Sequence, residues 1–131
     1  MESRMKRHVI ECAWLIAAAL FCAAAAPEPV RIDVAMIDYR FSPDHLNLEH
    51  GLHYRLHLEN RGTETHEFTA PMFFAAAKLD NPEVLNREHT EAVLQPGESK
   101  DIFLTPGAPG DYDLRCGDHD WDGMIGGITV R

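Results

Sequence analysis

Apolar and polar residues alternate with a period of two along most of this chain after residue 29. In the clearest example, Tyr54, Leu56 and Leu58 alternate with charged residues and a histidine. Such alternation puts the apolar side chains on one face of a β-strand. The same pattern recurs in residues 30–36, 46–48, 90–94, 100–105, 112–116 and 124–130. Because Gly, Pro and Asn turns separate these short strands, the sequence predicts an all-β fold, an antiparallel sandwich or barrel.

One stretch, residues 71–88, breaks the alternation. Its sequence, PMFFAAAKLDNPEVLNRE, contains three consecutive alanines and shows no period of two. Alanine favours helix. We therefore expect one or two short helices inserted between strands.

The first 25 residues have the pattern of an export signal. Arg4, Lys6 and Arg7 precede the apolar run CAWLIAAALFCAAAA, and small residues near Ala25 offer a cleavage site. A retained membrane anchor is the alternative, but the run is short and rich in alanine for a bilayer span. We predict a cleaved signal peptide over 1–25, a single domain over 26–131, a periplasmic location and no stable membrane insertion after cleavage.

The charge of the predicted mature chain is strongly negative. Removal of residues 1–25 leaves 9 basic and 19 acidic residues, a net charge of about −10. Nucleic acids and anionic membranes would be repelled by such a chain. A basic protein or a cation is the expected partner.

Signal cleavage also removes Cys12 and Cys22, so that Cys116 is the only cysteine left. Exported proteins meet an oxidising environment, and a single cysteine cannot form an internal disulfide. A thiol retained there is buried and inert, linked to another chain, catalytic or bound to a metal.

The surroundings of Cys116 favour a metal. Cys116 is the last inward residue of one predicted strand and Met124 is the first of the next, with His119 on the seven-residue loop between them. A thiolate, an imidazole and a thioether suit copper, which must be held as both Cu(I) and Cu(II). Zinc is the alternative, but it favours more thiolate or histidine ligands than these. A blue copper site also needs a second histidine.

His66 is the best candidate for that second histidine. It follows the end of the strand that contains Leu58 and precedes the apolar Phe68, so it can lie at one end of a sandwich. The remaining histidines of the mature chain occupy outward strand positions, turns or a helix end, where surface exposure is expected. They are His45, His50, His53, His57 and His89.

Two segments resemble the cupredoxin superfamily, which includes plastocyanin, pseudoazurin and azurin. One is YDLRCGDHDWDGMIGGITV, whose C-x2-H-x4-M spacing is similar to that of plastocyanin and pseudoazurin. The other is FSPDHLNLEHGLHYRLHLENRGTETHEF, similar to the half of the family domain that supplies the first histidine. The resemblance covers nearly all of the mature chain. It implies a Greek-key β-sandwich that binds one copper ion through His66, Cys116, His119 and Met124.

One position departs from the family. Plastocyanin and azurin usually carry asparagine directly after the first histidine, where its side chain ties the two ligand loops together. Glu67 stands there in this chain. Its carboxylate is expected either to take over the hydrogen bonds or to approach the metal.

The leading functional hypothesis is a monomeric periplasmic electron carrier. The exposed edge of His119 is the expected electron route, and Asp118, Asp120 and Asp122 would steer a basic redox protein, such as a c-type cytochrome, toward it. Trp121 would add an apolar contact. Ordinary turn chemistry accounts for the aspartates equally well.

Two other classes are weighed against it. A copper tolerance or delivery protein fits the acidic loop, but the chain lacks the Met/His clusters expected of copper chaperones. An enzyme is not expected, because one site whose ligands all come from the protein leaves no open position for substrate. A binuclear copper centre would require a second cysteine in the loop.

Overall fold

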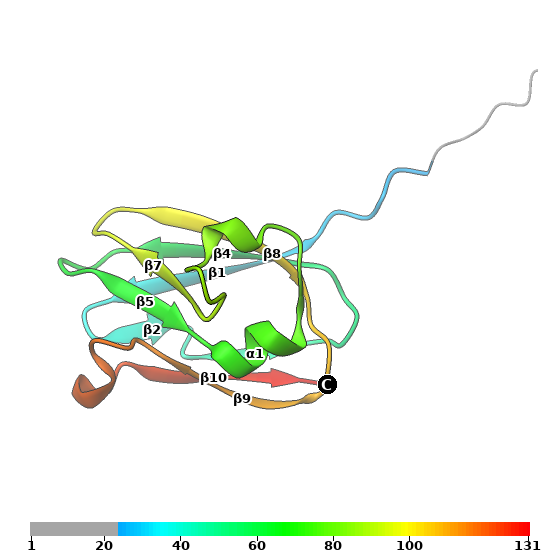
Figure 1. The fold of residues 1–131 in the computed structure, drawn as a ribbon. Helices are drawn as coiled ribbons and strands as arrows, with labels where there is room; N and C mark the ends of the chain where they lie inside the picture. Colours follow the sequence, from blue (N-terminus) through cyan, green and yellow to red (C-terminus); the bar gives the residue numbers. More distant parts are fainter. Residues whose placement is uncertain (1–23) are drawn as a thin grey trace, which may run out of the picture.

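Two five-stranded sheets pack face to face in the computed structural model, which describes residues 24–131 (Figure 1). The predicted signal peptide over 1–25 lies almost wholly outside the described residues, and its cleavage stays a prediction. Within the described range, no helix is long and apolar enough to cross a membrane.

The first sheet has the strand order β2-β1-β4-β8-β6. Its strands are β1 (Val30–Ile37), β2 (Arg40–Ser42), β4 (Tyr54–Asn60), β6 (Lys78–Leu79) and β8 (Ser99–Thr105). The central strand β4 shows the predicted alternation, since every second residue from Tyr54 to Asn60 is buried and those between are half-buried.

The second sheet has the order β3-β10-β9-β5-β7. Its strands are β3 (His45–Leu48), β5 (His66–Thr69), β7 (Glu91–Leu94), β9 (Gly110–Arg115) and β10 (Ile125–Val130). The predicted all-β sandwich is therefore confirmed. Most pairs are antiparallel as expected, but β1 pairs with β4, and β3 with β10, in parallel. Parallel pairing needs a long crossover, and the β1–β4 connection supplies one because it places β3 in the opposite sheet.

The core lies between the two sheets and takes apolar side chains from both. Phe68 of β5 stands near its centre, with its ring centroid 6.0 Å from those of Phe41 and Phe74. The fully buried apolar side chains include Val34, Met36, Leu56, Leu58, Phe73, Leu94, Ile102, Leu104, Leu114 and Ile128. Burial of each such side chain contributes about 1.5–3 kcal/mol to the free energy of unfolding.

The helical insertion predicted over 71–88 is present. It consists of α1 (Pro71–Ala76) and a 3₁₀ helix, η1 (Pro82–Val84). Proline begins each helix, where its missing N–H is not needed. Phe73 and Phe74 anchor α1 in the core. The insertion lies toward the end of the sandwich opposite the loop between β9 and β10 (Figure 1).

Asn60, at the end of β4, organises the turn that leads to β5. Its side-chain amide donates hydrogen bonds to the carbonyl oxygens of Leu94 (2.9 Å) and Glu64 (2.8 Å). Its carbonyl oxygen accepts from the backbone N–H of Gly62 at 2.9 Å. One buried side chain thus connects the turn to β7 and sets the point at which β5 begins with His66.

Replacing Asn60 by alanine is expected to lower the free energy of unfolding by about 1–3 kcal/mol, because it strips buried backbone groups of their partners. Urea denaturation of the metal-free protein measures this loss. Asn47→Ala, at an exposed position of β3, is the matched control and should cost less than about 0.5 kcal/mol. Equal losses in the two variants would show that Asn60 does not hold the turn.

Candidate metal centre

The candidate metal ligands come from three segments that meet at one end of the sandwich. His66 is the first residue of β5, Cys116 follows the last residue of β9, and Met124 directly precedes β10. His119 lies in the loop between β9 and β10, which leaves the left end of the molecule in Figure 1. β5 and β9 are antiparallel neighbours in one sheet, with Thr69 opposite Arg115, so the chain that continues from β9 through Cys116 runs along β5 toward His66.

The cluster itself is tight. The Cys116 Sγ lies 3.9 Å from the His66 Nδ1 and 3.4 Å from the His119 Nδ1. One ligand atom from each of the three residues lies within 4.8 Å of the others. Cys116 and His66 are fully buried, and the His119 side chain is 12% exposed. The structure therefore brings together the three residues in which the sequence analysis placed the equatorial ligands.

Met124 is fully buried and belongs to the same loop framework. Its carbonyl oxygen accepts from the Cys116 N–H at 3.0 Å, and its N–H donates to the His119 carbonyl at 3.1 Å. A 3₁₀ helix, η2 (Asp120–Asp122), turns the loop, and Gly123 ends it with a left-handed φ of 86° that suits glycine. Local backbone bonds thus place the ends of the C-x2-H-x4-M segment next to each other.

Among residues 24–131, five further histidines lie outside this cluster. His53, directly before β4, and His57, on β4, are half-buried where surface exposure was expected, and they pair with Asp80 and Asp101 at 2.8 and 2.7 Å. The remaining three are exposed: His45, His50 and His89.

Glu67 ties the two ligand segments together. Its Oε2 accepts from the Asp118 N–H at 2.9 Å, and its own N–H donates to the Cys116 Sγ at 3.3 Å. A Cβ at Gly117 would lie 3.1 Å from that carboxylate oxygen, so glycine leaves room for the contact. Burial raises the pKa of the Glu67 carboxyl, which lies 3.7 Å from the thiol. Of the two expected roles for Glu67, the hydrogen-bonding one is observed.

The outer nitrogens of both candidate histidines face carboxylates. The His66 Nε2 lies 2.6 Å from the Asp38 Oδ1, and the His119 Nε2 lies 2.7 Å from the Glu64 Oε2. The Tyr39 hydroxyl donates to the other Glu64 oxygen at 3.0 Å, and this contact raises the pKa of Tyr39. These three residues could not be identified from the sequence, because nothing in the local pattern links Asp38 to a histidine 28 positions away.

This arrangement corrects one expectation about His119. The loop is exposed, but the edge of the His119 imidazole is largely covered. Glu64 binds its outer nitrogen, and the centroid of the Tyr39 ring lies 5.2 Å from that of the imidazole. Only 12% of the side chain reaches solvent. An electron that leaves through this imidazole would pass groups that the sequence did not reveal.

The donor set fits copper. Two imidazole nitrogens and one thiol sulfur converge, with a buried thioether beside them, which is the ligand set of a type 1 copper site. Burial raises the pKa of the Cys116 thiol, so a metal ion must displace its proton on binding. Zinc would have little use for the methionine.

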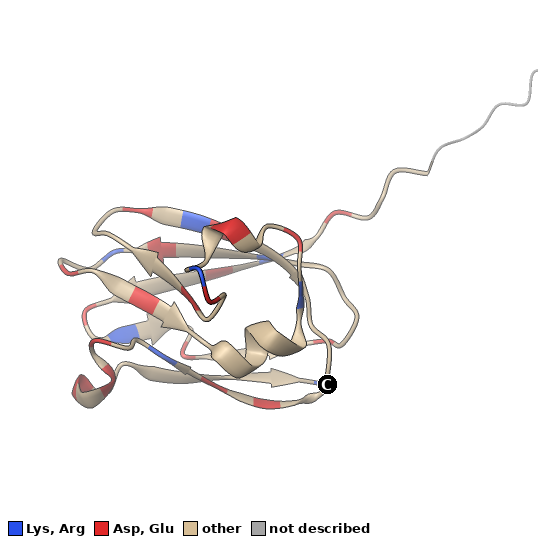
Figure 2. Ribbon diagram, viewed as in Figure 1, with Lys and Arg blue, Asp and Glu red and all other residues tan. Residues whose placement is uncertain are grey.

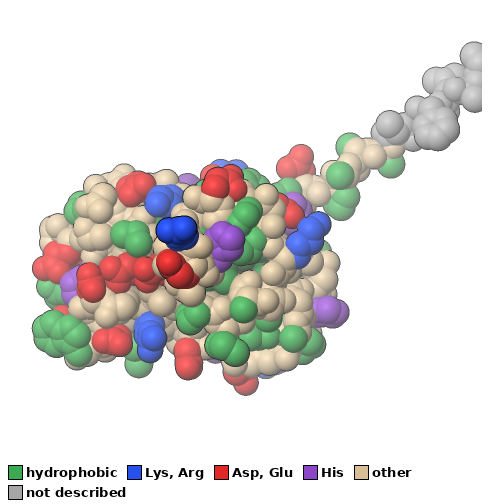
Figure 3. Space-filling model, viewed as in Figure 1, with side chains coloured by type: hydrophobic (Ala, Val, Ile, Leu, Met, Phe, Trp, Pro, Cys, Tyr) green, Lys and Arg blue, Asp and Glu red, His purple; other side chains and the backbone are tan. Residues whose placement is uncertain are grey.

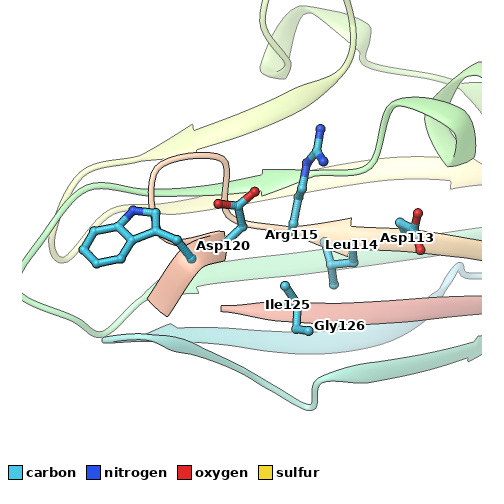
Figure 4. A pocket seen from close by; sticks show the side chains of 7 residues that line it. Asp113, Leu114, Arg115, Asp120, Ile125 and Gly126 are labelled. Atoms are coloured by element: carbon cyan, nitrogen blue, oxygen red, sulfur yellow. The ribbon is translucent and has the colours of Figure 1, made fainter. Parts of the chain in front are cut away.

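Negative charge surrounds this end of the molecule. Figure 2 shows acidic positions in the β9–β10 loop and in β5, and Figure 3 shows acidic side chains gathered on the left part of the visible face. Trp121 protrudes from the loop and is 79% exposed. Beside it lies an open hollow, to which Leu114 and Ile125 contribute apolar surface and Arg115 and Asp120 charged groups (Figure 4).

Comparisons with known proteins agree with this geometry. A model of the cupredoxin-like domain family matches residues 9–130. Reduced auracyanin from the photosynthetic bacterium Roseiflexus castenholzii is 19% identical with a TM-score of 0.60, over 80% of this chain and 99% of that chain. Auracyanin A, a "blue" copper protein from Chloroflexus aurantiacus, is 15% identical with a TM-score of 0.58, over 79% and 100%.

A third similar structure comes from another kind of protein. It is the metal-binding domain, with Cu(I), of a Cu(I)-exporting P-type ATPase from Streptococcus pneumoniae. That domain is 16% identical with a TM-score of 0.53, over 82% of this chain and 92% of that chain. At these identities the likeness is one of fold. No curated protein matches the chain in sequence.

The role of Glu67 can be tested by substitution. Glu67→Ala is expected to lower the free energy of unfolding of the metal-free protein by about 1–3 kcal/mol, because the Asp118 N–H loses its acceptor. Glu67→Gln keeps an oxygen acceptor and should cost less than about 0.5 kcal/mol. Urea denaturation at neutral pH compares them. If glutamine costs as much as alanine, the hydrogen bond is not what ties the two segments together.

Proposed function

This chain belongs to the cupredoxin-like domain family, and on that premise we propose that it is an exported blue copper protein that carries single electrons. The observation that carries the proposal is the convergence of His66, Cys116 and His119 within 4.8 Å, beside the buried Met124. Copper held there would alternate between Cu(I) and Cu(II).

Each residue has a distinct part in this proposal. Cys116 supplies the thiolate, His66 and His119 supply their Nδ1 nitrogens, and Met124 supplies a weak axial thioether. Strand ends and loop hydrogen bonds hold these side chains in place. Because the donors are held before the metal arrives, little rearrangement is needed between oxidation states.

The same burial argues against copper delivery as the main role. A delivery protein must release its ion to another protein's ligands, and that exchange needs access to the donor atoms. Here Cys116 and His66 are fully buried and His119 is nearly so. No enzymatic activity is proposed, because the four donors leave no position for a substrate.

A basic redox protein is the proposed partner. Trp121, which is 79% exposed, and Tyr39, which is 40% exposed, offer apolar contact near His119. Asp118, Asp120 and Asp122 add negative charge around them. We call these five residues the docking patch. Complementary charge speeds the encounter of such partners more than it strengthens the complex.

The proposed location is the periplasm, and the proposed state is a monomer with one copper ion per chain. Support for export comes from the basic and apolar segments of residues 1–25. It also comes from the single cysteine left after cleavage, which needs a metal or deep burial in an oxidising compartment.

Copper loading tests the site. Addition of Cu(II) to the mature protein is expected to give one equivalent of bound copper and an intense thiolate-to-copper absorption band. Cys116→Ser should abolish the band, and His66→Ala should weaken copper binding and shift the band. The control His50→Ala alters an exposed histidine outside the cluster and should leave both unchanged. A band that survives Cys116→Ser would refute the assignment.

Salt dependence tests the docking patch. Oxidation of the reduced protein by a basic c-type cytochrome, followed by stopped flow, is expected to slow at least about tenfold between 0.01 and 0.1 M salt, as the Debye length falls from about 30 to about 10 Å. Replacing Asp118, Asp120 and Asp122 with asparagine should flatten this dependence.

The matched control carries Glu28→Gln, Glu83→Gln and Glu88→Gln, which make the same change in net charge at exposed positions outside the docking patch. If both triple variants flatten the salt dependence equally, net charge and not the patch steers the partner. No electron exchange, together with rapid transfer of copper to a Cu(I) chelator, would favour the copper-handling alternative.

A further inference from the structure

The outer nitrogens of the two candidate copper histidines are both bound by carboxylates, one from the turn after β1 and one from the turn before β5. We propose that Asp38 and Glu64 form a carboxylate clamp that fixes the orientation of both imidazoles and lowers the reduction potential of the copper site. This inference rests on the proposed function. It assigns a role to two residues that are not themselves ligands.

Neighbouring hydrogen-bond donors hold the Asp38 carboxylate in place. Its carboxylate accepts hydrogen bonds from the Thr63 N–H at 2.9 Å and the Thr63 hydroxyl at 2.7 Å, in addition to its 2.6 Å contact with the His66 Nε2. All of these partners are hydrogen-bond donors, as suits an ionised carboxylate, and an aspartate carboxyl is ordinarily ionised at neutral pH.

Gly62 shows how closely this pair is packed. A Cβ at Gly62 would overlap the Asp38 Oδ1 and lie 2.7 Å from the His66 Nε2. Any side chain at this position would push the carboxylate away from the imidazole. Glycine at position 62, in the turn between β4 and β5, thus leaves the space that Asp38 needs to reach His66.

Glu64 is held in a similar way on the other side. One carboxylate oxygen accepts from the Tyr39 hydroxyl at 3.0 Å and the other lies 2.7 Å from the His119 Nε2. The backbone carbonyl of Glu64 accepts from the buried Asn60 side chain. Both ends of the residue are fixed, and the Tyr39 ring covers the His119 ring at 5.2 Å.

The clamp sets which nitrogen of each imidazole carries the proton. An ionised carboxylate can only accept, so the nitrogen that faces it bears hydrogen. With hydrogen on Nε2, each neutral ring leaves the lone pair of Nδ1 free, and those nitrogens lie 3.9 and 3.4 Å from the Cys116 Sγ. Carboxylates at this position also make the imidazole a stronger electron donor.

The clamp also places two negative charges just beyond the ligands. Cu(II) carries one more positive charge than Cu(I), so nearby anions favour the oxidised form. Asp38 should have the larger effect, because its side chain is 23% exposed while that of Glu64 is 47% exposed and better screened. Removal of either charge should therefore raise the reduction potential.

The test compares the potentials of Asp38→Asn, Glu64→Gln and the double variant by spectroscopic redox titration at a single neutral pH. Glu64→Gln keeps an oxygen acceptor for the His119 Nε2 and turns its NH2 group toward the Tyr39 hydroxyl, which can accept. Asp38→Asn removes the charge and also one of the two oxygens that accept from Thr63 and His66. Asp38→Asn is expected to lower the ratio of Cu(II) to Cu(I) affinity about tenfold, a rise of about 59 mV for one electron. Glu64→Gln should give a smaller rise, and the double variant should exceed either.

The matched control is Glu88→Gln, which removes one charge from an exposed residue near α1. Its potential should stay close to that of the wild type. If neither clamp variant exceeds this control, the clamp does not tune the potential. If Asp38→Asn does not fold, Glu64→Gln alone decides the question. The Glu64 carboxylate is exposed, so this substitution is not expected to disturb folding.

A copper-free measurement tests the positioning half of the inference. Long-range ¹H–¹⁵N correlation spectra of the metal-free protein at neutral pH should show His66 and His119 as the Nε2–H tautomer. A ring without hydrogen on Nε2 would overturn the clamp at that ring. Failure of the proposed function is distinguishable from failure of the clamp. In that case the wild-type protein itself would show no thiolate-to-copper absorption band.

Discussion

Two hydrogen bonds from one residue hold the candidate site together. Glu67 donates its N–H to the Cys116 Sγ and accepts the Asp118 N–H on its carboxylate. These bonds join the start of β5 to the loop after β9, so Glu67 fixes the two ligand segments relative to each other. The rest of the sandwich positions the two segments that these bonds join. Asn60 sets where β5 begins, and the shared sheet places β9 beside β5.

The electrostatics of the site follow from an unusual combination of burial and negative charge. Cys116 and Glu67 are both shielded from water, and burial raises the pKa of each. Asp38 and Glu64 stand behind the two imidazoles as further acidic groups. A cation bound between the ligands would offset the mutual repulsion of these four acidic groups. The site is thus shaped for a positive ion that is bound by soft donors and surrounded by hard anions.

The fold was predictable where alternation was strong and was missed where burial removed it. β4 could be predicted from the sequence because one of its faces is buried and the other is half-exposed. β5 was not predicted, because all four of its residues are buried and no period of two remains. β2 and β6 span only three and two residues, too few for any period. The parallel pairings depend on crossovers between sheets, which local sequence does not encode.

The local half of the site was predictable from the order of its residues. The spacing of Cys116, His119 and Met124 is short enough for backbone hydrogen bonds within one loop to bring them together. His66 could be named because it follows a strand end before an apolar residue. The groups that bind the outer nitrogens are set by the packing of the strands. Asp38 and Glu64 lie 28 and 55 positions from their histidines. Contacts at such separations depend on how strands pack, which no local pattern of residues records.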